Sequence, residues 1–166
     1  PERLLFCDGA RLVWWQPSQV RPMHLRDTDG KPTVILTRWP NLVFHVADRD
    51  LSVATFAGEG RPAANTKLLH STLPNIYGDT RVCTGNATLP VGAAVDEIPA
   101  WEAVIFETAF THSNYPGALR RGRAKDPMDV EDFWRARDGA VDGFPYKRAA
   151  DTGVTLGEWM AEGGRA

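Results

Sequence analysis

Cys83 is the residue of this chain whose type and surroundings best fit covalent chemistry. A cysteine attacks through its thiolate, and an unperturbed thiol, with a pKa of roughly 8.5, is only slightly ionised near neutral pH. Arg81 lies two positions before Cys83. In an extended chain both side chains would lie on one face, where the cation favours the thiolate. Cys7 stands in a strand-like stretch instead, and we expect it to be a small buried hydrophobic residue.

The segment that contains Cys83 is rich in turn-forming residues and reads Leu73-Pro74-Asn75-Ile76-Tyr77-Gly78-Asp79-Thr80-Arg81-Val82-Cys83-Thr84-Gly85-Asn86. The wider stretch of about residues 66–97 has no long periodic pattern. Long loops inside compact domains are uncommon, and the exceptions are often functional. We therefore expect this stretch to form an active-site flap.

The part of the chain before the flap, about residues 3–58, has the pattern of β-strands. Asp8-Gly9 predicts a two-residue hairpin turn, and Pro22 restricts its strand to an edge or a bulge. The predicted strands are Arg3–Cys7, Arg11–Gln16, Val20–Leu25, Thr33–Thr37, Leu42–Ala47 and Leu51–Ala57. Val20–Leu25 could continue the strand Arg11–Gln16 after Pro17, so the short connections predict an antiparallel meander of four or five strands that leads into the flap.

The part after the flap, about residues 98–160, has helical patterns. The predicted helices are Trp101–His112, Asp129–Arg137 with Asp129 as N-cap, and a short last helix at Val154–Met160. The basic stretch Arg120–Lys125 between them is expected to be a solvated loop. The order of strands, flap and helices predicts one α+β domain over residues 1–166.

The composition narrows the class of partner. The chain has 19 basic and 21 acidic residues and a formal net charge of −2. This balance gives no basic excess for binding a nucleic-acid backbone. No apolar run reaches membrane-spanning length, and no charged-then-apolar leader opens the chain. We therefore expect a cytoplasmic protein with reduced thiols and with neither a nucleic-acid nor a membrane partner.

The flap resembles the active-site flap of the ubiquitin-conjugating enzyme (UBC) superfamily. In that family a His-Pro-Asn tripeptide precedes an apolar or aromatic pair, a polar turn and an apolar residue just before the catalytic cysteine. Here Pro74-Asn75-Ile76-Tyr77, the turn Gly78-Asp79-Thr80 and Val82-Cys83 follow in the same order. Leu73 stands ten positions before Cys83, where the family has its histidine, which is generally viewed as a brace for the asparagine loop.

The flanking segments extend the resemblance over roughly residues 10 to 135. A helix that opens with Ile98-Pro99-Ala100 follows the flap, and Asn114-Tyr115-Pro116 resembles the Asn/Pro segment of the family after that helix. Together with Trp14-Trp15 and Cys83-Thr84-Gly85-Asn86, this pattern is similar to a divergent bacterial branch that includes protein B of the PRTRC cassettes.

The resemblance implies a UBC-like fold and a thioester-forming role for Cys83. Asn75 would stabilise the oxyanion that forms when an amine attacks the thioester, and such a donor contributes on the order of 3 kcal/mol. Asn86 is a second amide, and Asp79, Asp96 or Glu97 could help to deprotonate the amine. The residues expected to support the flap are Pro74, Tyr77, Asp79 and Asn86.

The partners implied are a ubiquitin-like protein, a ThiF-like activating enzyme and a protein or small-molecule amine acceptor. No cofactor and no metal is expected, because ATP is spent by the activating enzyme and the histidines form no metal-ligand spacing with the cysteines. His70, just before the flap, could replace part of the missing brace.

Two alternatives remain open on the sequence. Leu73 in place of the histidine favours a non-catalytic UBC-like module that only binds a ubiquitin-like protein or an activating enzyme. An unrelated thiol hydrolase is the third reading, and it would require a histidine base beside Cys83.

Overall fold

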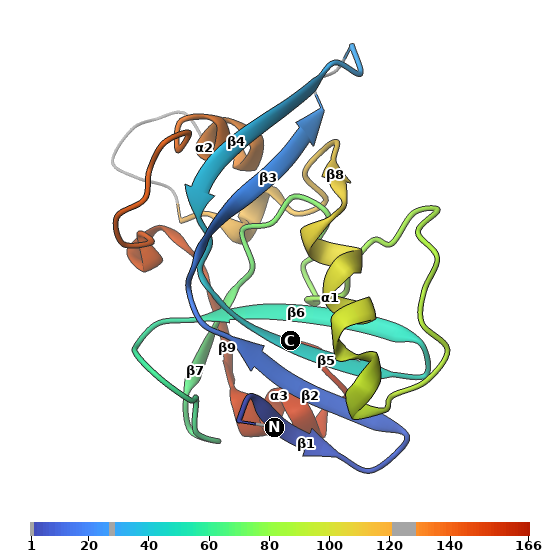
Figure 1. Ribbon diagram of the computed structural model, residues 1–166. Helices are drawn as coiled ribbons and strands as arrows, with labels where there is room; N and C mark the ends of the chain where they lie inside the picture. The colour runs from blue at the N-terminus through green and yellow to red at the C-terminus, as the bar shows by residue number, and fades with distance from the viewer. Residues whose placement is uncertain (1, 27–28, 121–128) are drawn as a thin grey trace.

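The computed structural model describes residues 2–26, 29–120 and 129–166. Within these ranges the chain is an α+β structure built on two sheets (Figure 1). The six-stranded sheet has the order β1-β2-β5-β6-β7-β9, and the three-stranded sheet has the order β4-β3-β8. The strands are β1 Leu4–Cys7, β2 Arg11–Gln16, β3 Val20–Arg26, β4 Pro32–Arg38, β5 Asn41–Ala47, β6 Asp50–Phe56, β7 Lys67–His70, β8 Ala109–Phe110 and β9 Asp151–Thr155. The helices are α1 Ile98–Phe106, α2 Val130–Arg135 and α3 Leu156–Ala161, with short 3-10 turns at Val95–Glu97, Pro116–Ala118 and Tyr146–Arg148.

The hairpin predicted around Asp8-Gly9 is confirmed, but its two central residues are Gly9 and Ala10, because the amide of Asp8 donates to the carbonyl of Arg11 at 3.2 Å. Strands β1 and β2 pair antiparallel, and Gly9 adopts a φ of 87°, a conformation that glycine reaches without a Cβ penalty. The Asp8 carboxylate accepts hydrogen bonds from the backbone amides of Ala10 (3.0 Å) and Arg11 (2.7 Å). Cys7, at the end of β1, is exposed, so its predicted burial is wrong.

The meander is interrupted, which corrects the prediction of one continuous run of strands. Strand β2 pairs directly with β5, and the β3–β4 hairpin leaves the large sheet to form a second one with β8 (Figure 1). Pro17 directly follows β2 and cannot donate to a sheet ladder, which favours this departure. Strand β8 joins β3 only at His24 and Leu25, so Pro22 does lie on a locally free edge.

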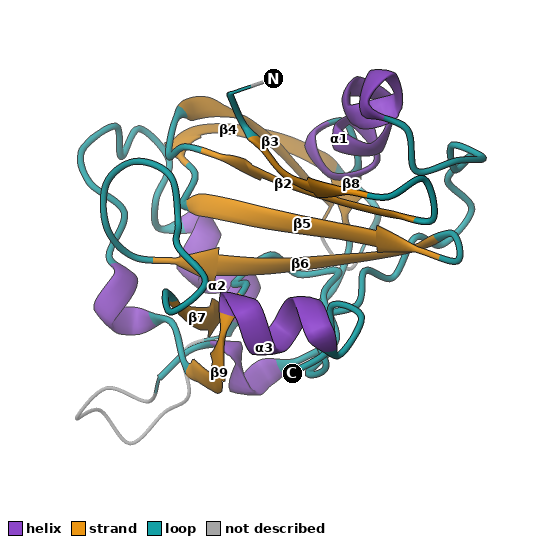
Figure 2. Cartoon of the chain, turned by 90° about the horizontal axis from the view of Figure 1, so that it is seen from below, coloured by secondary structure: helices purple, strands orange, loops and turns teal. Residues whose placement is uncertain are grey.

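Both faces of the large sheet are buried, because helices cover each of them (Figure 2). Along β2, Trp14 belongs to the core cluster that also holds Trp101 and Ile105 of α1. Its neighbour Trp15 belongs to the opposite cluster, which includes Trp159 of α3. Consecutive strand residues point to opposite faces, so the Trp14-Trp15 pair supplies one large ring to each core layer.

The helices differ from their predicted bounds. Helix α1 begins at Ile98 and ends at Phe106, and two residues of the predicted helix, Ala109 and Phe110, form β8 instead. Asp129 caps α2 as predicted, since its side chain accepts from the amide of Glu131 at 3.0 Å. Val154 belongs to β9, and α3 starts at Leu156. The flap also contains β7, although no regular element was predicted there.

The basic stretch Arg120–Lys125 lies mostly outside the described residues. Arg120 is exposed, and its backbone amide donates to the carbonyl of Arg148 at 2.7 Å.

A candidate active site around Cys83

The chain just before Cys83 forms a short hairpin that is docked on strand β6. The amide of Tyr77 donates to the carbonyl of Arg81 at 2.8 Å, and this bond closes the hairpin. The amide of Val82 donates to Leu51 (2.8 Å) and that of Val53 to Thr80 (2.9 Å). Strand β7 pairs with the other half of β6, from Ala54 to Phe56. The free edge of β6 is therefore shared between β7 and the flap hairpin, and Cys83 follows where this pairing ends.

A second set of backbone bonds holds Cys83 from the side of Pro74 and Asn75. The amide of Cys83 donates to the carbonyl of Asn75 at 2.7 Å, and the amide of Asn114 donates to the carbonyl of Pro74 at 2.9 Å. The Pro74-Asn75 dipeptide thus lies between the backbones of Cys83 and Asn114. This arrangement brings together three segments that are separated in sequence.

Leu73, in the position of the family's histidine, is part of the hydrophobic core and is 2% exposed. Its loop is held by other groups. The indole Nε1 of Trp134 donates to the carbonyl of Thr72 at 2.7 Å, in a buried bond. Breaking this bond would leave a buried indole N–H and a buried carbonyl without partners, which is unfavourable. The contact can therefore fix the loop without a histidine.

His70 contributes to the flap through Tyr115. The two rings pack at a centroid distance of 4.8 Å. The Tyr115 ring in turn lies against Gly78, where an added Cβ would be 3.1 Å from the ring. Burial lowers the pKa of His70, which favours the neutral imidazole in this packing. His70 therefore supports the hairpin turn at Gly78 through the ring of Tyr115.

The environment of Cys83 lowers the pKa of its thiol. The side-chain hydroxyl of Tyr77 is the main cause, and partial burial opposes it. The backbone amide of Gly85 and the side chain of Asn114 act in the same direction as Tyr77. Donors that approach sulfur stabilise its charged form, so the thiolate is favoured relative to a free cysteine. The same approach raises the pKa of Tyr77.

Arg81 was predicted to favour the Cys83 thiolate and Asp79 to help deprotonate the amine, but in the structure these two side chains pair with each other. Arg81 is not among the causes of the lowered Cys83 pKa, and its guanidinium is paired with Asp79 at 2.7 Å. Arg165 also approaches Asp79, at 3.4 Å. Burial raises the pKa of Asp79, but the bonds and charges of these arginines outweigh it, and the pKa lies below its usual range. A carboxylate held in this way is a weak proton acceptor.

The remaining predicted residues differ in their exposure and in their contacts. The side chain of Asn75 is half-buried, whereas Asn86 is exposed. Glu97 accepts from the backbone amides of Gly92 (3.2 Å) and Ala94 (3.4 Å) and so closes the turn before α1.

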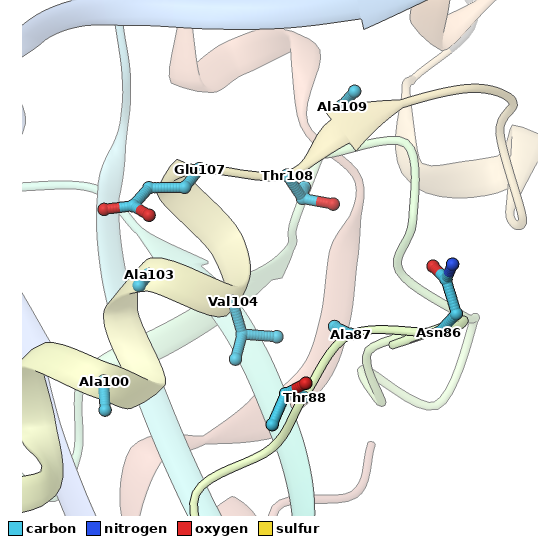
Figure 3. Close-up of a pocket in the computed structure, with 9 residues that line it drawn as sticks. All are labelled: Asn86, Ala87, Thr88, Ala100, Ala103, Val104, Glu107, Thr108 and Ala109. Carbon is cyan, nitrogen blue, oxygen red and sulfur yellow. The ribbon is translucent and has the colours of Figure 1, made fainter.

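A groove opens beside the loop that follows Cys83. It has a volume of about 380 Å³ and lies between the loop Asn86–Thr88 and the end of α1 (Figure 3). Val104 of α1 points toward the loop, and small residues, including Ala100 and Ala103, leave the space open. The groove begins three residues after Cys83, at Asn86, so a chain segment bound in it would lie beside the loop that carries the thiol.

Asn114 is the residue of the site that the sequence interpretation missed. The Asn114-Tyr115-Pro116 segment contributed to the family resemblance, but no role was predicted for its amide. The only signal in the sequence was the position of this asparagine after the helix.

The described residues contain no group of three or more histidine, cysteine, aspartate or glutamate side chains that could hold a metal ion. Over the same residues, no helix has the length and apolar character needed to cross a bilayer.

Comparisons with known proteins assign the chain to a family. No match was found among curated proteins or among solved structures. A family model described as prokaryotic E2 family D matches residues 1–148, which include the flap, α1 and α2. This match confirms the predicted relation to a bacterial branch of ubiquitin-conjugating-like proteins, while the likeness to the PRTRC protein remains a prediction. The chain belongs to prokaryotic E2 family D.

Proposed function

We propose that the protein carries a ubiquitin-like modifier as a thioester on Cys83 and transfers it to an amine. One observation carries this proposal: a partly exposed thiol of lowered pKa stands directly after a hairpin that is fixed to the sheet. The family supports the general role of a conjugating-type enzyme with a ubiquitin-like protein and an activating enzyme as partners.

The reaction would proceed in two acyl transfers. The Cys83 thiolate attacks the thioester carbonyl of the modifier on a ThiF-like activating enzyme, and the thiolate of that enzyme leaves. A protein or small-molecule amine then attacks the new thioester and forms a tetrahedral oxyanion. The oxyanion collapses, the C–S bond breaks with its electron pair on Cys83, and the amine proton passes to solvent or to a base. Neither transfer needs a nucleotide or a metal on this chain.

Asn75 remains the proposed oxyanion donor. Its backbone position is fixed by the bond from Cys83, and its half-buried side chain forms no hydrogen bond with another described residue. A free amide next to the nucleophile is available to bind a developing negative charge.

The test is a loading assay with the activating enzyme, the ubiquitin-like protein and ATP. The wild type should form an adduct that thiol reductants remove. Cys83→Ser should form a more stable oxyester, and Cys83→Ala should form none. Cys7→Ala is the matched control and should load normally, since this exposed cysteine lies at the end of β1. An unchanged adduct in Cys83→Ala would rule the proposal out.

The non-catalytic binding module is the second candidate, and the burial of Leu73 in the core is the observation that favours it. It predicts that the modifier binds without transfer under any condition. The thiol hydrolase is disfavoured, because none of the four histidines, all within the described residues, contributes to the pKa of Cys83. His112 bonds its neighbour Thr111, and His45 is buried beneath α3.

A further inference from the structure

The side chain of Asn114 contains a buried donor without a partner. Its Nδ2 atom is inaccessible to solvent and forms no hydrogen bond of normal geometry. A buried N–H group without an acceptor is unfavourable, and such groups are rare enough in native proteins to require an explanation. The structure therefore holds this amide in an arrangement that is unfavourable until an acceptor is present.

The thiol of Cys83 is a reactive group that this donor approaches. The backbones of Asn114 and Cys83 flank the Pro74-Asn75 dipeptide through bonds of 2.9 Å and 2.7 Å. The Asn114 side chain lies close enough to the sulfur to contribute to its lowered pKa, although the approach falls short of a full hydrogen bond. A neutral thiol is a weak acceptor, whereas a thiolate is a strong one.

The segment around Asn114 is fixed on both sides. The backbone amide of Ser113 approaches the carboxylate of Glu131, a residue of α2, and acts to lower the pKa of that carboxylate. The Tyr115 ring packs on His70 and lies so close to Gly117 that a Cβ there would be 2.6 Å from the ring. A donor held on a fixed backbone needs little reorganisation when charge develops, and this preorganisation is what makes such donors effective.

We propose that Asn114 is a catalytic residue whose amide donates to the Cys83 sulfur whenever that sulfur carries negative charge. This inference rests on the proposed thioester function. The charge is present on the attacking thiolate and again when the C–S bond of the thioester breaks and its electron pair returns to sulfur. Asn114 thus serves the leaving group, while Asn75 serves the carbonyl oxygen.

The test measures the reactivity of Cys83 without any partner protein. In a Cys7→Ser background, alkylation by iodoacetamide is followed between pH 6 and pH 10. Loss of this donor disfavours the thiolate, so Asn114→Ala should slow alkylation near neutral pH by roughly threefold to tenfold, which corresponds to about 0.6–1.4 kcal/mol, and move the profile to higher pH. Asn114→Asp, nearly identical in shape, should slow it further, because it replaces the donor by a negative charge.

The control is Asn65→Ala, which removes an exposed amide from a loop remote in sequence and should leave the profile unchanged. Thermal melting of each variant checks that it is folded, and Asn114→Asp preserves the volume if Asn114→Ala does not fold. An unchanged profile in a folded Asn114 variant overturns the inference. A shifted profile with an unchanged single-turnover transfer rate overturns the leaving-group role. Failure of the wild type to load would instead count against the proposed function, and the alkylation result would be unaffected.

Discussion

The chain just before Cys83 and the chain just after it are held in opposite ways. Before it, Thr80 is fully buried and hydrogen-bonds two groups of the C-terminal segment, the indole of Trp159 (2.9 Å) and the carbonyl of Gly164 (2.7 Å). After it, the loop from Thr84 to Val91 is mostly exposed, and Val91 is 78% exposed. The nucleophile therefore stands at the boundary between an anchored segment, residues 77–82, and an open segment, residues 84–91.

The difference indicates that the two segments on either side of the thiol have different functions. Thr80 has a φ of 72°, which is strained for a β-branched residue and persists only where its surroundings fix it. The anchored segment thus keeps the approach to Cys83 in one conformation. The open segment lines the groove and leaves it accessible to a partner. The local free energy of unfolding varies along a protein chain, and segments that bind partners are often among those with the lowest values.

The side chains and carbonyl that hold the anchored segment, here called the anchor, belong to the part of the chain that follows the family match. Trp159, Gly164 and Arg165 all follow residue 148, where that match ends. Arg165 also bonds Asp50 at the start of β6, at 2.9 Å. The C-terminal segment therefore ties the flap hairpin to the same strand on which the hairpin is docked.

Trp159→Ala should have the largest effect on the anchored segment. The ring is fully buried, so its removal should lower the free energy of unfolding by about 3–5 kcal/mol. Urea denaturation measures the change. Trp159→Phe is the control, which keeps an aromatic ring and removes the donor to Thr80, and it should be clearly milder. A loss below about 1 kcal/mol in Trp159→Ala would show that α3 does not hold the hairpin.

Acid should weaken the same anchor through His45. Burial, assisted by the charges of Arg11 and Arg165, lowers the pKa of His45 from 6.5 to about 4. The ring packs against Trp159 at a centroid distance of 5.7 Å, and its Nε2 has no partner. The unfolded chain takes up a proton below pH 6.5 and the folded chain does not. Stability is therefore complete above pH 6.5, falls as the pH drops toward 4, and levels off below it.

The size of this loss follows from the shift, at about 3 kcal/mol between the two plateaus. Denaturation by urea at several values between pH 7 and pH 4 measures it. His45→Asn, which does not titrate, should be less stable at neutral pH and should lose less on acidification. Equal pH dependence in both proteins would assign the acid sensitivity to the carboxylates, such as Asp79.

Features that depend on residues close together in the sequence, such as turns and helix caps, were predicted correctly. The Asp8-Gly9 hairpin and the Asp129 cap are confirmed because turn and cap chemistry are decided within a few positions. Two features of the sheets could not be predicted from a local pattern, because they depend on strands that are distant in sequence. These are the separate sheet formed by β3 and β4 with β8 and the pairing of β9 with β7. The family of the flap was recognised from the spacing before Cys83, and the match confirms it.

The geometry of the site was harder to predict, since its contacts are distant in sequence. Thr80 and Trp159 are 79 positions apart, and Thr72 and Trp134 are 62 apart. Arg81 stands two positions before Cys83, but its guanidinium pairs with the carboxylate of Asp79. Asn114 is 31 positions after Cys83, and its backbone bond to the carbonyl of Pro74 places it beside the flap.

Thr80→Ala should have a moderate effect on the anchor. It leaves the buried indole N–H of Trp159 and the carbonyl of Gly164 without their partner, at a loss of about 1–3 kcal/mol. Thr80→Ser keeps the hydroxyl and should remain close to the wild type in urea denaturation. If both variants lose equal stability, the methyl group and not the hydroxyl network holds the turn.

Ala87→Phe, in the open segment, should have the smallest effect on folding and a large one on function. Ala87 is exposed and lines the groove, so a ring added there should change the free energy of unfolding by less than about 0.5 kcal/mol. It should also occupy the groove and slow the loading of a ubiquitin-like modifier, because the incoming polypeptide loses its path to the thiol. Ala63→Phe makes the same change at an exposed site in the loop between β6 and β7 and should load normally. Thr80→Ala and Ala87→Phe would then separate the two segments, since the first weakens folding and the second weakens modifier loading. Normal loading by Ala87→Phe would mean that the modifier reaches Cys83 from another side.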